Sequence, residues 1–183
     1  MTRRLLVLDV HGVVLNNPLP GFLSYLDTFS RGNSSAKSRW AMIRQPFWEG
    51  KMSDQQMWST LAPGADSLRL REELEARYAP GPYYHHLMAT HHPCWLLSNH
   101  RKQWLTPRLE RFGLASRFEK VLVSDELQAA KPSLESFGPV IEIMRSNRVT
   151  FVDDNVQNVD AARRFGVDAV LADEGIDWSA IAA

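Results

Sequence analysis

Asp9 directly follows a short apolar run near the start of the chain, residues 5–8. A carboxylate at the carboxyl end of a buried strand lies where open α/β sheets bind ligands and carry out chemistry. Further along the chain, other short stretches carry a hydroxyl, a lysine or paired carboxylates: Ser98-Asn99, Lys131-Pro132 and Asp153-Asp154-Asn155. Because the ends of parallel strands lie side by side, we expect these stretches to converge on Asp9.

The chemistry open to this set is phosphoryl transfer. A carboxylate such as that of Asp9 can attack phosphorus and form an acyl phosphate. Asp9 and Asp154 would repel each other unless a hard cation lay between them, and Mg²⁺ prefers oxygen ligands of this kind. Ser98 and Lys131 would supply a hydroxyl donor and a fixed positive charge for the phosphoryl oxygens.

The elements that must position these residues can be read from the apolar pattern. Short runs that are apolar on both alternating faces are typical of strands covered on both sides. Helical patterns separate them, which favours a parallel sheet with right-handed crossovers. The predicted strands are residues 5–8, 94–97, 121–123, 149–152 and 169–171, and the predicted helices between them are residues 102–112, 133–144 and 156–165.

The stretch from about residue 16 to residue 89 interrupts this alternation. It contains no strand-like run and reads as several helices, predicted over residues 20–29, 34–48, 53–61 and 66–78. Ser53 and Gln56 have the spacing of a capping box, which marks a helix start. An all-helical insertion after the first strand would lie over Asp9 as a lid. The apolar stripe of Trp40, Ile43 and Phe47 is expected to form the core of this bundle.

In order and spacing, the motifs resemble those of the haloacid dehalogenase superfamily of hydrolases, in the subgroup with an α-helical cap after the first strand. The resemblance spans nearly the whole chain. It implies an α/β fold, with a three-layer α/β/α Rossmann-like parallel sheet in residues 1–15 and 90–183 and a cap in residues 16–89. The motifs that carry it are Asp9-Val10-His11-Gly12-Val13, Leu97-Ser98-Asn99, Lys131-Pro132, and Asp153-Asp154-Asn155 followed by Asn158 and Ala161-Ala162.

The resemblance implies a nucleophile and a Mg²⁺ site. By it, Asp9 is the nucleophile. Asp9 and Asp154 would hold Mg²⁺ by their side chains, and His11 would do so by its backbone carbonyl. Asp153 would support the metal directly or through water.

The resemblance also implies the residues that bind the transferred group. Ser98 and Lys131 would hold it, with Asn99 and the amide of Gly12 nearby. Lys131 would in addition neutralise charge between the carboxylates. The expected activity is that of a Mg²⁺-dependent phosphatase acting on a small phosphorylated metabolite.

His11 departs from the family pattern, because phosphatases of this family usually carry an aspartate there as general acid and base. An unperturbed histidine has a pKa near 6.5, well placed for this role. A bound Mg²⁺ close by would disfavour the imidazolium that must give the proton. His11 is therefore the candidate acid and base, and its presence leaves altered chemistry open.

Three alternatives remain open at this stage. A dehalogenase-like enzyme would use Asp9 to attack carbon; such members of the family usually lose the metal-binding aspartates, which this chain keeps. A phosphonatase-like enzyme would need a Schiff-base lysine in the cap, with Lys37 and Lys51 as candidates. A catalytically weak member would only bind a phosphorylated ligand or a partner protein.

Composition narrows the class of protein. Lys and Arg total 21 and Asp and Glu total 21, and this zero net charge argues against nucleic acid as the main partner. A single cysteine, Cys94, excludes an intrachain disulfide. No apolar run has the length of a membrane span or of a secretory signal. We expect a cytoplasmic protein with a small-molecule phosphorylated substrate, no membrane partner, and a monomeric or homodimeric state.

Other polar residues are given less weight. The adjacent pairs His85-His86 and His91-His92 suit a surface or interface better than a zinc site, because adjacent side chains point apart. For His100, which follows Ser98-Asn99, a site role and a plain loop role are equally favoured. Arg44 and Lys51 of the cap are expected mainly on a solvated face.

Overall fold

The computed structural model describes residues 3–28, 34–89 and 91–172, and it is built on a five-stranded parallel sheet. Each predicted strand is confirmed. β1 pairs with β2 through Leu6 and Cys94 and with β4 through Leu5 and Val149, so the first strand is central. In sheet order the strands are β3 (Lys120–Val123), β2 (Cys94–Ser98), β1 (Arg3–Leu8), β4 (Asn147–Asp153) and β5 (Asp168–Leu171).

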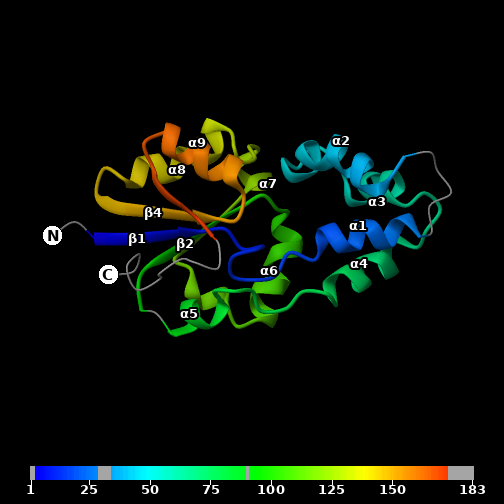
Figure 1. Cartoon of the computed structure of the whole chain (residues 1–183), viewed down its shortest axis with the longest axis horizontal. Helices are drawn as coiled ribbons and strands as arrows, with labels where there is room; N and C mark the ends of the chain where they lie inside the picture. Colours follow the sequence, from blue (N-terminus) through cyan, green and yellow to red (C-terminus); the bar gives the residue numbers. More distant parts are fainter. Residues whose placement is uncertain (1–2, 29–33, 90, 173–183) are drawn as a thin grey trace.

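Helices cover both faces of this sheet, which gives the predicted three-layer α/β/α arrangement (Figure 1). Successive side chains of β1 point to opposite faces. Leu6 and Leu8 therefore join the apolar cluster that contains residues of α5 and α6, and Leu5 and Val7 join the cluster of α8 and α9. The helices of the sheet domain are α5 (Tyr84–Ala89), α6 (Lys102–Arg111), α7 (Ser124–Leu127), α8 (Leu134–Ile143) and α9 (Val156–Arg164), with a 3₁₀ turn at Ala115–Arg117.

In its described residues, the inserted segment forms four helices at one end of the molecule (Figure 1). The predicted capping box is confirmed: Ser53 accepts from the amide of Gln56, and the Gln56 side chain accepts from the amide of Ser53. The last helix ends at Glu75, three residues before its predicted end, and Phe29 of the first predicted helix lies outside the described residues. The helices are α1 (Leu19–Asp27), α2 (Ala36–Trp48), α3 (Asp54–Leu61) and α4 (Ser67–Glu75).

The cap has its own apolar core, and α6 of the sheet domain contributes to it. Ile43 and Phe47 are buried there and Trp40 packs against them, as predicted. Trp104 of α6 stacks on Trp58 of α3, with the ring centroids 6.0 Å apart. The cap therefore packs directly on α6, beside the carboxyl edge of the sheet.

The two connections between the cap and the sheet domain run side by side. The amide of Asn16 donates to the carbonyl of Ala79 at 3.0 Å, and the amide of Ala79 donates to Oδ1 of Asn16 at 2.9 Å. Beyond this crossing, Tyr83 and Leu87 join the apolar cluster of the sheet domain. The predicted domain boundaries at residues 16 and 89 stay a prediction. The helix α5, which lies inside the predicted cap range, packs against the sheet. Among the described helices, none has the length and apolar character needed to cross a bilayer.

Candidate active site

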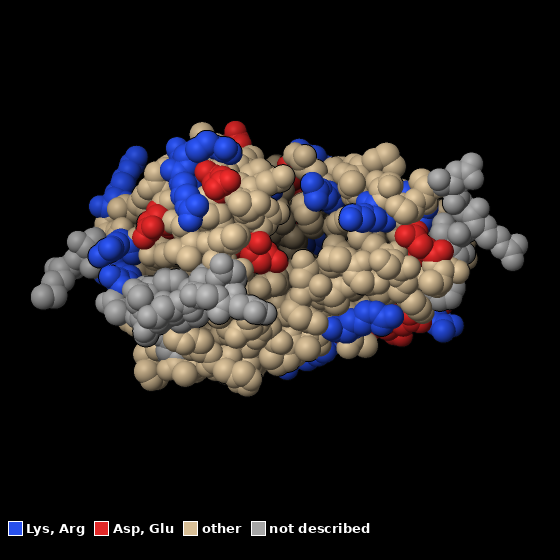
Figure 2. All heavy atoms as spheres, viewed as in Figure 1, with Lys and Arg blue, Asp and Glu red and all other residues tan. Residues whose placement is uncertain are grey.

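The carboxyl edge of the sheet brings the predicted residues together at one end of a cavity of about 180 Å³. Asp9 follows β1, Ser98 ends β2, Lys131 lies between α7 and α8, and Asp154 follows β4. Figure 2 shows the surface hollowed between the sheet domain and the cap, with acidic side chains at the edge of the hollow. Six of the predicted site residues line the cavity: Asp9, His11, Ser98, Asn99, Lys131 and Asp154.

Lys131 is the buried cation of the site. Its side chain is 1% exposed, and its Nζ lies 3.1 Å from Oδ1 of Asp9 and 2.5 Å from Oδ2 of Asp153. It also donates to the carbonyl of Leu97 at 2.8 Å. Burial alone would lower the pKa of Lys131, but the charges of Asp153 and Asp9 outweigh it and raise that pKa. Lys131 therefore carries a fixed positive charge against the Asp9 carboxylate.

Asp153 holds this lysine in place. Its carboxylate is fully buried and accepts from Lys131, from Nδ2 of Asn158 at 3.0 Å, and from the amide of Asn155 at 2.8 Å. Both oxygens are engaged by protein donors. The predicted metal role of Asp153 would thus be indirect, and its visible role is to orient Lys131.

The carboxylates are crowded. One oxygen each from Asp9, Asp153 and Asp154 can be found within 4.8 Å of one another. Burial raises the pKa of Asp9 to about 7; Lys131 opposes this rise, and the charges of Asp153 and Asp154 add to it. Burial, followed by the charge of Asp153, also raises the pKa of Asp154. A cation between Asp9 and Asp154 would reduce the repulsion between their carboxylates.

Gly12 makes room for Asp154. Its φ of +82° lies in the left-handed region, which glycine adopts without steric cost. A Cβ at this position would lie 1.9 Å from Oδ2 of Asp154. The loop after β1 therefore approaches Asp154 so closely that no side chain fits at residue 12. This compact set of oxygen donors fits Mg²⁺.

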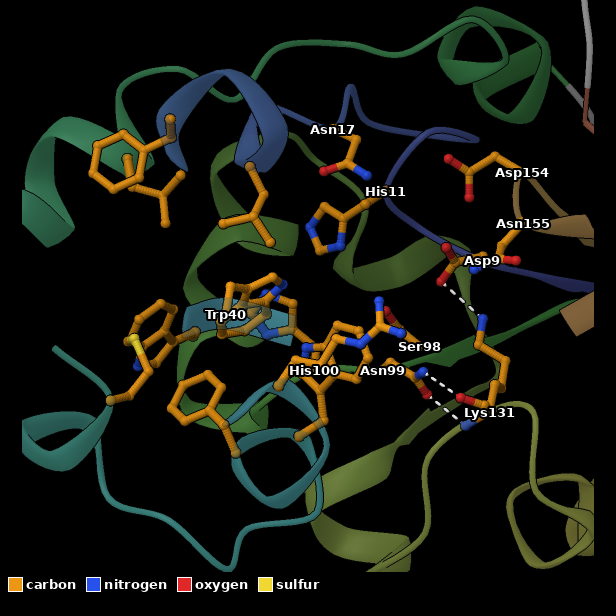
Figure 3. Close-up of a pocket in the computed structure, with 18 of the residues that line it drawn as sticks. Asp9, His11, Asn17, Trp40, Ser98, Asn99, His100, Lys131, Asp154 and Asn155 are labelled. Carbon is orange, nitrogen blue, oxygen red and sulfur yellow. Dashed lines mark hydrogen bonds and ion pairs between the residues drawn. The ribbon is translucent and has the colours of Figure 1, made fainter. Parts of the chain in front are cut away.

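Two of the predicted phosphate-binding groups are already occupied. The amide of Gly12 donates to the carbonyl of Leu15 at 2.7 Å. The side-chain amide of Asn99 donates to the carbonyl of Lys131 at 2.8 Å and accepts from its amide at 2.7 Å, as Figure 3 shows. Asn99 thus joins the loop after β2 to the loop of Lys131. Ser98 and Lys131 remain as the predicted phosphate ligands that line the cavity.

The His11 side chain points away from the carboxylates, toward α6. Its Nε2 lies 2.6 Å from Nη1 of Arg108. A guanidinium can only donate, so Nε2 of His11 is the acceptor and carries no proton. Burial, followed by the charges of His100, Arg108 and Lys131, lowers the pKa of His11 well below its ordinary value. The imidazole is therefore neutral.

Arg108 is the centre of a buried network that the sequence reasoning missed. Its side chain has no exposed surface and binds Glu75 of α4 through Nε and Nη2. Its Nη1 also contacts Nε2 of His100 at 3.0 Å, and its guanidinium lies 3.5 Å from the ring centroid of Tyr78. The network joins the site to the cap. No sequence motif around Arg108 indicates a role in the site, because its partners lie up to 97 positions away along the chain.

The structure distinguishes the remaining polar residues that line the cavity from those that do not. His100 is buried and lines the cavity, and burial followed by the charge of Arg108 lowers its pKa to about 3. Arg44 lines the cavity as well, whereas Lys51 pairs with Glu49 at 2.7 Å. Of the described residues, those grouped as a potential metal site include none of the paired histidines.

Residues 83–172 match the protein family described as haloacid dehalogenase-like hydrolase. This segment runs from α5 to β5 and includes Ser98, Lys131, Asp153 and Asp154. Through this segment the chain is a haloacid dehalogenase-like hydrolase. Its sheet order, its inserted helical cap and the position of Asp9 after the central strand agree with that assignment. No curated protein matches the chain in sequence.

Solved structures share the complete fold of this chain. The family enzyme bt-2542 from Bacteroides thetaiotaomicron, in complex with magnesium and inorganic phosphate, has a TM-score of 0.75 at 19% identity, covering 98% of each chain. L-2-haloacid dehalogenase from Xanthobacter autotrophicus has a TM-score of 0.67 at 18% identity, covering 97% of this chain and 80% of that one. Such low identity shows the fold alone.

Proposed function

We propose that this hydrolase is a Mg²⁺-dependent phosphatase of a small phosphorylated molecule. The observation that carries the proposal is the buried Lys131, whose Nζ lies between the carboxylates of Asp9 and Asp153. Asp154 and Ser98 line the same end of the cavity. This combines a carboxylate nucleophile, a fixed cation and an oxygen-rich metal site. The proposal includes a cytoplasmic location and a monomeric or homodimeric state.

Asp9 and Asp154, with the backbone carbonyl of His11, would hold Mg²⁺. When bound, the ion would lower the pKa of the carboxylates and neutralise charge on the phosphoryl oxygens. Of the predicted ligands, Ser98 and Lys131 are the side chains at the cavity that can contact those oxygens.

The reaction proceeds in two displacements. An oxygen of Asp9 attacks phosphorus, the ester P–O bond breaks, and its electron pair stays on the leaving oxygen. Water then attacks the aspartyl-phosphate, which releases inorganic phosphate and restores the carboxylate. Lys131 stabilises the negative charge on Asp9 before attack and on the phosphoryl group afterwards.

In this proposal His11 orients the loop after β1 and does not supply the proton at Nε2. That atom already accepts from Arg108, at 2.6 Å. The leaving oxygen is therefore protonated by water. Such an enzyme would favour esters whose leaving oxygen needs little help from an acid.

The test is phosphate release from a panel of small phosphate esters and an activated aryl phosphate, with Mg²⁺ and with chelator. We expect Mg²⁺-dependent turnover that falls at least about 10³-fold in Asp9→Asn, because the nucleophile is lost. Asp160→Asn is the matched control, since Asp160 is exposed on α9 and pairs only with Arg163 among the ion pairs of the described residues. Equal activity in Asp9→Asn would refute the nucleophile assignment.

Dehalogenation is the second candidate. The unprotonated Nε2 of His11 favours a reaction that needs no acid, and one structural relative is named as a dehalogenase. The retained carboxylates Asp153 and Asp154 argue against it. Halide release from small haloacids in the presence of chelator would favour this candidate over the phosphatase.

A further inference from the structure

The cap side of the cavity is mainly apolar. The polar groups of the site gather at the sheet edge, while Trp40 of α2 lies across the cavity from them in Figure 3. The apolar and aromatic residues that line the cavity are Leu19, Phe22, Trp40, Phe47, Trp48, Met57, Trp58, Leu61, Leu74 and Trp104. These residues come mainly from the cap, with Trp104 from α6.

Several polar groups along this wall have partners within the protein. Nε1 of Trp104 donates to Oδ2 of Asp54 at 2.8 Å. The ring of Tyr78 lies 3.5 Å from the guanidinium carbon of Arg108, and His100 is bonded to Arg108 as well. The cap side also carries the side chains of Asn17 and Arg44 and the indole N–H groups of its tryptophans. Arg44 is exposed and lies over the Trp48 ring at 5.7 Å.

We infer that the substrate is a phosphate monoester whose organic group, here called its body, is small and apolar and carries a planar ring. This inference rests on the proposed phosphatase function. A body rich in hydroxyl groups would find few partners along this mainly apolar wall, and buried unpaired polar groups are costly. An aromatic body gains both burial and edge or face contacts with the tryptophan rings.

The size of the cavity limits the body. An apolar cavity of roughly 150 Å³ accepts one benzene molecule. The cavity here, at about 180 Å³, must accept the phosphoryl group as well. A single ring joined to the phosphate by a short linker fits these limits.

The experiment compares esters with equal leaving groups. Benzyl phosphate and glycerol 3-phosphate are both esters of primary alcohols, so a large difference in kcat/KM reports recognition of the body. We expect benzyl phosphate to be favoured at least about tenfold. Equal or better turnover of glycerol phosphate would overturn the inference while the proposed phosphatase function stands.

A variant tests whether the tryptophan wall causes the preference. In Trp40→Leu we expect the benzyl-to-glycerol ratio of kcat/KM to fall about three- to tenfold, because a ring contact is lost. Trp95→Leu is the matched control, since Trp95 lies in β2 and packs against the α8 and α9 side of the sheet. A ratio that is unchanged in Trp40→Leu, or that changes equally in Trp95→Leu, would overturn the inference.

A binding measurement tests the ligand class independently of the proposed phosphatase activity. With Mg²⁺ present, calorimetry compares benzylphosphonate with a phosphonate that carries a dihydroxypropyl group. We expect Kd to be at least about tenfold lower for benzylphosphonate. If this holds while no ester is hydrolysed, the proposed function fails and the ligand class stands. If both phosphonates bind equally, the ligand class is wrong.

Discussion

Replacing Arg108 by methionine tests the buried network that joins the cap to the site. The guanidinium is fully buried and donates to Glu75, to Nε2 of His11 at 2.6 Å and to Nε2 of His100 at 3.0 Å. Methionine keeps the length of the apolar stem and removes every donor. The substitution therefore leaves one carboxylate and two imidazoles without their partner.

The magnitude follows from the burial of each group. Removal of one partner of a buried ion pair costs about 3–5 kcal/mol, because the remaining charge stays unpaired. The Glu75 side chain is 26% exposed and regains some hydration in the variant, which reduces the cost. The unpaired histidine nitrogens add about 1–3 kcal/mol. We expect a net loss of about 3–5 kcal/mol in the free energy of unfolding.

Urea unfolding of the wild type, of Arg108→Met and of the double variant with Glu75→Leu measures this loss. We expect the double variant to recover at least about 1.5 kcal/mol relative to the sum of the single variants. Arg145→Met is the control, because Arg145 is exposed at the end of α8 and should change stability by less than about 0.5 kcal/mol. A loss below about 1 kcal/mol in Arg108→Met would refute the proposed network.

Three further predictions concern the site. Gly12→Ala should weaken Mg²⁺ binding at least about tenfold by calorimetry, because its Cβ would displace Asp154; Gly64→Ala, at φ +78° with no atom within 4 Å, carries the backbone strain without the clash and should not. Without metal, Asp9→Asn should raise the urea midpoint at pH 8 and have little effect at pH 4. With a pKa raised from 3.8 to about 7, the Asp9 carboxyl lowers stability progressively as pH rises between these values, and the loss is complete above pH 7. An equal gain at both pH values would contradict this. His100 should stay neutral between pH 5 and 8 in NMR titrations because burial lowers its pKa to about 3, and its contribution to stability should be complete above pH 6.5 and decline as pH falls toward 3; a midpoint near 6.5 would show that it is solvated.

Local patterns in the sequence were sufficient to predict the sheet. The run before Asp9 is apolar on both faces because β1 is central and covered by two layers. Asp9, Ser98 and Asp154 could be placed at one edge because each follows or ends a predicted strand. The predicted end of α4 was wrong by three residues, since its charged pattern continues beyond Glu75 where the chain turns back to pair Ala79 with Asn16.

The roles of individual site residues needed the tertiary structure. Asp153 and Asp154 are adjacent in sequence, yet one is fully buried against Lys131 and the other lines the cavity, because successive residues leave a strand end in different directions. The sequence likewise identified His11 as unusual without revealing its partner.

The sequence by itself determined the strands, the inserted helices and the set of polar residues at the sheet edge, because periodicity and capping are local properties of the chain. The tertiary structure alone decided that His11 faces Arg108, that Arg108 binds Glu75 of the cap, and that a tryptophan-rich wall lines the cavity. These contacts join segments 33 to 97 residues apart, and they exist only once the cap has packed on α6.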